Sequence, residues 1–276
     1  MSAPYSKQAQ SQLDCDNFWR HSAWLAGLVS SCLLCCATSH ADSSQPGPHP
    51  LIWSQIGKLP DFTTGIWEVP MNPAAFASAT QPSFTAAYTE RHKAYVAQQA
   101  SGGNQDSPGA NCLPPGMPTI MSQPYPLQIL YGPREVTIDI EAFMQVRHIY
   151  TDGRAHPESP DPTFNGDSIG HWEGATLVVD TVGFVDDTPL SFDWGMQHSP
   201  KMHILERFRL TSPDTLEVQT RIEDPDALTQ PWTSTRTFKR HADWRIAEYI
   251  CEQNNRNTVD PNGKAGIILT PPAPAH

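Results

Sequence analysis

The chain has 276 residues, a formal net charge of −11 and no cluster of basic residues. An acidic protein without a basic patch is a poor partner for nucleic acids, so we do not expect binding to DNA or RNA. About 235 residues remain after the N-terminal segment described next, enough for one sizeable core and more typical of a single β-rich domain than of two small ones.

The N-terminal segment is typical of a signal peptide. Trp24–Leu34 is an apolar run that follows Arg20 and is too short to span a bilayer. Ser39, His40 and Ala41 then offer a small-x-small cleavage site. We predict a signal peptide over residues 1–41 and an exported, periplasmic or extracellular protein with no stable membrane span; a buried helix is the alternative interpretation.

Cysteine usage supports an oxidising compartment. Four of the six cysteines fall within the predicted signal peptide, which leaves Cys112 and Cys251 in the mature chain. Two remaining cysteines in an exported protein favour one disulfide bond. A catalytic thiol is the weaker alternative.

The rest of the chain divides by its periodicity. Residues 42–126 form a proline-broken extension with one predicted helix, Phe84–Gln99, which Ser83 can cap. Residues 127–257 alternate with period two and are predicted to form an antiparallel meander that closes into a lipocalin-like β-barrel, because closure removes the sheet edges. Residues 258–276 are predicted to be a C-terminal tail. The expected strands are Glu135–Ile140, Ala142–Tyr150, Ser168–Trp172, Ala175–Phe184, Met202–Leu210, Thr215–Ile222, Trp232–Lys239 and Trp244–Glu252.

Alternation within these strands predicts which side chains face the barrel interior. In Ala142–Tyr150 the apolar set includes Met144 and Val146, so Arg147 is expected outside. Several polar residues share the apolar parity of their strands. The predicted inward-facing polar residues are His148, Tyr150, Asp180, Glu206, Arg236 and Glu248.

Ionisable groups inside a barrel need a partner, a proton or water, because burying an unpaired charge costs several kcal/mol. One interpretation is purely structural, with Arg236 bridging Glu206 or Glu248. The other is a polar patch in a small-molecule cavity, which accounts for the whole set more economically. The aromatic residues expected to wall this cavity are Trp172, Phe208, Trp232 and Phe238.

Two sharper patterns are weaker than they look. Gly166–Gly170 matches the G-x-S-x-G pattern of hydrolases, but a strand pattern rather than a helix follows its serine. A metal site built from His156, His198 or His203 with a loop acid is an alternative, although no H-x-H or H-E-x-x-H motif is present. We expect no cofactor.

Five sequence motifs between Cys112 and Asn255 resemble those of a known family. In combination they make this stretch similar to a widespread, largely uncharacterised family of bacterial secreted proteins. The resemblance implies export and a lipocalin-like β architecture, and brings no reaction with it; Ala175 stands where the family's turn has an acid. The motifs are Cys112–Met117, His148–Pro157, Pro162–Phe184, His203–Phe208 and Glu248–Asn255.

The preferred functional hypothesis is a cofactor-independent lyase or isomerase acting on a small apolar or aromatic molecule in the barrel. His148 or Glu206 would be the general base, Asp180 the proton donor, Arg236 the oxyanion stabiliser and Tyr150 a hydrogen-bond donor. The alternatives are a periplasmic carrier of a hydrophobic ligand and a structural envelope module with a solid core.

Overall fold

The computed structural model describes residues 50–70, 80–101, 104–106, 109–186, 188–191, 195–252, 258–259 and 265–268. The predicted signal peptide lies outside these residues. None of the helices in the described part of the chain has the length and apolar composition needed to cross a bilayer. Cys112 and Cys251 form a disulfide bond, as predicted.

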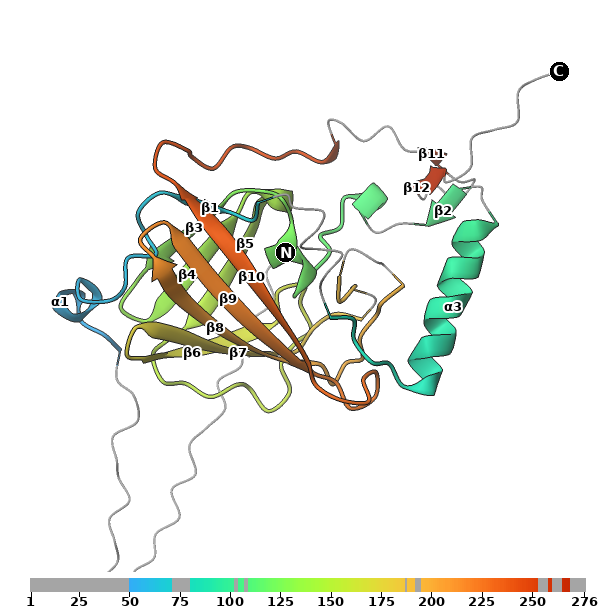
Figure 1. Cartoon of the computed structure of the whole chain (residues 1–276), viewed down its shortest axis with the longest axis horizontal. Coiled ribbons are helices and arrows are strands. Elements are labelled where there is room, and N and C mark those ends of the chain that lie inside the picture. Colours follow the sequence, from blue (N-terminus) through green and yellow to red (C-terminus); the bar gives the residue numbers. More distant parts are fainter. Residues whose placement is uncertain are drawn as a thin grey trace, which may run out of the picture. The chain divides into compact units, whose positions relative to one another are not determined.

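A closed β-barrel dominates the structure, which confirms the predicted fold class (Figure 1). Within the described residues the ring has nine strands in the order β1-β10-β9-β8-β7-β6-β5-β4-β3. Their bounds are β1 Ile66–Glu68, β3 Leu127–Tyr131, β4 Glu135–Ile140, β5 Gln145–Tyr150, β6 Asp167–Glu173, β7 Thr176–Val182, β8 His203–Ser212, β9 Thr215–Glu223 and β10 Trp232–His241.

The barrel includes two strands, β1 and β3, that the sequence analysis did not predict. β1 comes from the segment expected to precede the barrel, and it closes the ring by pairing with both β10 and β3. Because β1 occupies the free edge of β10, the predicted strand Trp244–Glu252 has no edge to pair with. That segment is not a strand; it leads to the disulfide at Cys251.

The helices in the described part of the chain are few and lie outside the ring of strands. α3, Ala86–Ala100, confirms the predicted helix, although it begins two residues later than expected. α1 is a single turn, Trp53–Ile56. Tyr88 and Arg91 of α3 hydrogen-bond to residues 197 and 198. Short 3-10 turns η1 (Gly109–Asn111), η2 (Thr119–Ser122) and η3 (Ala142–Met144) precede or separate the barrel strands.

A small second sheet involves part of the predicted tail. β12 (Ala265–Ile268) pairs with β11 (Thr258–Val259) and with β2 (Asn104–Asp106), all antiparallel.

One pair of barrel strands is parallel, and geometry requires it. Strand directions cannot alternate at every step around a closed ring with an odd number of strands. The parallel pair is β5–β6, with Ile149 opposite Ser168 and Tyr150 opposite Ile169. Parallel neighbours need a connection of about a dozen residues or more. Residues 151–166 supply it, and we refer to them as the crossover loop.

The crossover loop ends at Gly166, where only glycine fits. Its φ of +69° lies in the left-handed region, and a Cβ there would lie 2.7 Å from side-chain carbons of Phe184 and Thr181 and 2.8 Å from the Val182 carbonyl oxygen. The absence of a side chain therefore lets the loop pack directly on the end of β7 before it enters β6.

We predict that Gly166→Ala lowers the free energy of unfolding by about 2–4 kcal/mol, because it combines backbone strain with overpacking. Urea denaturation measures the loss. Gly174→Ala is the matched control: its φ is +60°, but nothing lies within 4 Å of the added Cβ, so only backbone strain of about 1–2 kcal/mol is expected. Equal losses in both variants would contradict the packing argument.

Candidate functional site

The interior of the barrel differs from the prediction along β5. Arg147 and Ile149 are buried, whereas Met144 and Val146 are 53% and 45% exposed. The predicted inward positions of His148 and Tyr150 are therefore wrong: His148 has a half-exposed side chain, and both residues lie on the outer face. The apolar-inside rule fails here because the Arg147 guanidinium finds strong partners inside.

Those partners form a polar cluster across the inside of the barrel wall. Arg147 Nη2 lies 2.5 Å from Glu206 Oε2, and both side chains are 1% exposed. The same guanidinium donates to the hydroxyls of Ser168 and Thr181, and Ser168 and Thr181 hydrogen-bond to each other at 2.9 Å. Glu206 faces inward as predicted, but Arg147 rather than Arg236 bridges it. Ser168 is buried in a strand, so it lacks the exposed turn that the hydrolase pattern requires.

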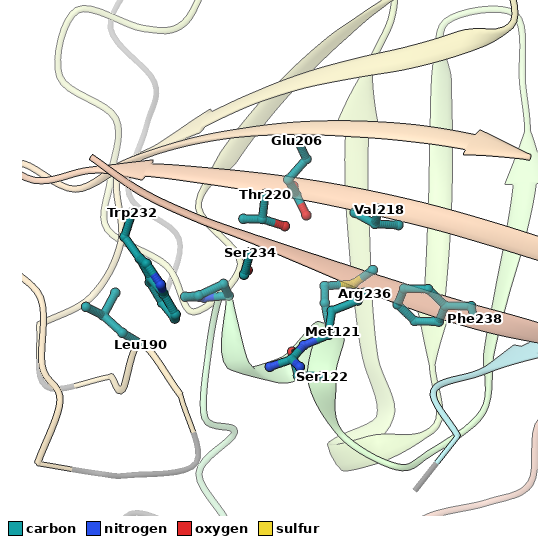
Figure 2. Close-up of a pocket in the computed structure, with 11 residues that line it drawn as sticks. Met121, Ser122, Leu190, Glu206, Val218, Thr220, Trp232, Ser234, Arg236 and Phe238 are labelled. Atoms are coloured by element: carbon teal, nitrogen blue, oxygen red, sulfur yellow. The ribbon is translucent and has the colours of Figure 1, made fainter. Parts of the chain in front are cut away.

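A small cavity adjoins this cluster. Its volume is about 20 Å³, room for roughly one water molecule. Figure 2 shows Glu206, Thr220, Ser234 and Arg236 around it, with Trp232 at one end and Phe238 at the other. Arg236 Nε donates to Ser122 Oγ at 3.2 Å, and burial lowers the pKa of its guanidinium.

The predicted aromatic wall is part of the core. Phe208, Trp232 and Phe238 are buried in the main apolar cluster, and Trp172 packs against it, with its ring 5.7 Å from that of Phe62. Side chains therefore fill most of the barrel, and this cavity is too small for an aromatic molecule.

Two further residues lie away from their predicted positions. Glu248 is exposed on the segment that follows β10. Asp180 lies on the outer face of β7, because Leu177, Val179 and Thr181 occupy its inner face.

Asp180 belongs to a chain of four ionisable side chains on the outside. Its Oδ1 lies 2.7 Å from His203 Nε2 and 3.2 Å from His156 Nε2, and His156 Nδ1 lies 2.5 Å from Asp167 Oδ1. Both nitrogens of His156 therefore face carboxylate oxygens, one from Asp167 and one from Asp180. His156 thereby ties the crossover loop to β6 and β7.

The Asp180–His203 pair shifts both titrations. Burial acts to raise the pKa of the Asp180 carboxyl, but the hydrogen bonds and charges of His203 and His156 outweigh it and hold the pKa below 3.8. The Asp180 carboxylate raises the pKa of His203 above 6.5. Asp180 is therefore ionised near neutrality, which is the wrong state for a proton donor.

The metal alternative finds no support in this arrangement. Among the described residues, no three His, Cys, Asp or Glu side chains are placed to hold a metal ion. His156 and His203 meet at Asp180. His198 is buried elsewhere, with Nδ1 2.8 Å from the Ser199 carbonyl oxygen and Nε2 2.6 Å from the Thr188 hydroxyl.

An open groove lies between β5 and the crossover loop and has a volume of about 470 Å³, within the range of small-molecule sites. Since Ile149 pairs with Ser168, the preceding residues His148 and Asp167 lie side by side on the outer face. His148 Nδ1 is 3.3 Å from Glu135 Oε2, and its ring is nearly parallel to that of Tyr150. The lining also includes Gln145, Val146, Pro157, Pro160, Asp161, Thr163, Phe164, Asn165 and Gly166.

A larger hollow of about 740 Å³ lies on the other side of the proline-rich part of the loop. Its described lining includes the acids Glu158 and Asp186 but no histidine or tyrosine. The smaller groove contains His148 and Tyr150, side chains that can transfer protons or donate hydrogen bonds, so we take it as the candidate site.

Sequence reasoning missed Asp167 and Asn165 in this groove, because both depend on the path of the crossover loop. Comparisons with known proteins add nothing to the assignment: no family model, curated protein or solved structure matches the chain significantly.

We predict that Glu206→Gln lowers the free energy of unfolding by about 3–5 kcal/mol, because it leaves the buried Arg147 charge without its partner. Chemical denaturation measures this. Glu217→Gln, which breaks the exposed pair with Arg209, serves as control and should lose less than about 1 kcal/mol. The double variant Arg147→Met/Glu206→Leu should recover most of the loss; equal losses for Glu206→Gln and Glu217→Gln would contradict this account.

We predict that Asp180→Asn lowers the pKa of His203, since the carboxylate is the main cause of the raised value. In the native protein the raised pKa of His203 stabilises the fold below pH 6.5, and this stabilisation is lost as the pH rises through the folded-state pKa of His203. The lowered pKa of Asp180 stabilises the fold above pH 3.8, and this stabilisation is lost as the pH falls through the folded-state pKa of Asp180. NMR titration of His203 tests the assignment, with Glu173→Gln beside His171 as control; an unchanged His203 in Asp180→Asn contradicts it.

Proposed function

We propose that the protein is an exported, cofactor-independent lyase or isomerase that binds a small apolar or aromatic molecule in the groove between β5 and the crossover loop. The observation that carries the proposal is the convergence of His148, Tyr150 and Asp167 on one groove of suitable size. The reaction class is thus the one expected from the sequence, but the site lies outside the barrel rather than inside it.

Proton transfer is the chemistry these groups suit. His148 is the general base: Glu135 holds its Nδ1 and stabilises the imidazolium that forms, which leaves Nε2 for the substrate. Tyr150, next along the same outer face, is a hydrogen-bond donor for a developing oxyanion. Asp167 lies beside His148 and is held by His156, so the two ionisable groups of the groove have different environments.

Other predicted catalytic residues take different roles in this proposal. Asp180 acts on the site through His156 and is a positioning residue. Glu206 is a poor base, because taking up a proton would break its ion pair with Arg147. Arg236 adjoins the inner cavity rather than the groove.

Export is supported by two independent features. One is the apolar run and cleavage site of the N-terminal segment. The other is the disulfide between Cys112 and Cys251, a bond that persists in oxidising compartments.

The function is tested without knowing the substrate. Incubated in D₂O with a library of small aromatic compounds, the wild-type protein should place deuterium on carbon in a substrate or release an elimination product, both visible by mass spectrometry. His148→Gln should lose this activity by about 10²–10⁴-fold, the usual contribution of a general base. His171→Gln, a half-exposed histidine on β6 outside the groove, is the control. Binding without any turnover would identify a carrier and contradict the enzyme.

A further inference from the structure

The charge of the groove indicates what kind of molecule it accepts. Its described lining contains two carboxylates, Asp161 and Asp167, and no lysine or arginine. A third carboxylate, that of Glu135, lies behind His148. A bound anion would therefore meet repulsion on several sides.

Nearby arginines do not offset these acids. Arg134 and Arg154 both bind Asp152, each at 2.7 Å from its Oδ2. Asp152 is a side chain outside the groove, and these two partners hold its pKa far below the ordinary value. Their charge is thus largely spent on a carboxylate that no ligand in the groove would meet.

The hydrogen-bonding groups of the groove point the same way. Asn165 donates its amide to Gln145 Oε1 and to the Val146 carbonyl oxygen, and its own Oδ1 is buried with no partner among the described residues. The Oδ1 atom is too enclosed for a ligand in the groove to reach, but the amide is already donated within the protein and is not offered to an anion.

The groove also has an aromatic and apolar side. Tyr150 belongs to its lining, with one face of the ring covered by the Arg154 guanidinium at 3.9 Å. Val146, Pro157 and Phe164 supply an apolar surface beside it.

We propose that the ligand of this groove is an organic cation, an amine on an apolar or aromatic body whose ammonium group lies between Asp161 and Asp167. This inference rests on the proposed function, because it assigns the chemical class of the molecule bound at the same site. The overall charge of −11 would also favour the approach of such a ligand.

The test uses three probes of similar size: benzylamine, benzyl alcohol and benzoate. Titrations are followed by ¹H–¹⁵N NMR at His148, Tyr150 and Asn165. Benzylamine should shift these signals with an affinity about tenfold above that of benzyl alcohol, and benzoate should not bind. The preference should shrink at high salt, because the groove is open to solvent.

Variants identify the groups responsible. Asp161→Asn/Asp167→Asn should remove the preference for benzylamine over benzyl alcohol, whereas Asp214→Asn, in the exposed turn between β8 and β9, should keep it. If benzyl alcohol or benzoate binds the wild type as well as benzylamine does, the cation proposal is wrong and the proposed site stands. If no probe shifts the groove signals, the proposed site itself fails.

Discussion

Closing a ring with an odd number of strands is the constraint on which the rest of this structure depends. Strand direction cannot alternate all the way round, so at least one pair must be parallel. Here that pair is β5–β6, and parallel neighbours cannot be joined by a tight turn. The crossover loop follows from this requirement. It returns along the outside of the barrel and creates the wall of a groove that an all-antiparallel meander would not have. The candidate site is thus a consequence of how the barrel closes.

The inside and the outside of the wall are coupled residue by residue at this point. Arg147, Ser168 and Thr181 belong to the buried cluster, and each is next in sequence to a residue of the outer site: His148, Asp167 and Asp180. Because successive side chains in a strand face opposite ways, an inner contact fixes the strand that carries the outer group. The Arg147–Glu206 pair holds β5 against β8 across the barrel, while the hydroxyls of β6 and β7 complete the cluster. The buried cluster therefore fixes the positions of β5, β6 and β7, the three strands that carry His148, Asp167 and Asp180 on their outer faces.

How much the sequence reveals depends on which kind of contact decides each feature. Periodicity was sufficient for most strands: β4 has its predicted bounds, and β8, β9 and β10 keep the predicted starts within one residue. The disulfide followed from the cysteine count together with the expectation of export. The face of β5 did not follow, because a buried arginine beside exposed Met144 and Val146 inverts the apolar signal on which parity depends. Glu206 and the aromatic residues were placed correctly because their strands carry unambiguous apolar neighbours.

The location of the candidate site could not be predicted from local sequence patterns for a related reason. His148 and Tyr150 were chosen as inward-facing residues of a cavity, and they reach a groove only because the crossover loop lies outside the strand that carries them. Asp167 comes beside His148 through the register of a two-residue parallel pairing, which no short-range signal encodes. A barrel this small, filled by Phe208, Phe238 and a buried ion pair, leaves little room for a ligand in its centre. Space for chemistry arises where regular pairing stops: the parallel β5–β6 junction has only two paired positions, whereas β6 and β7 share seven.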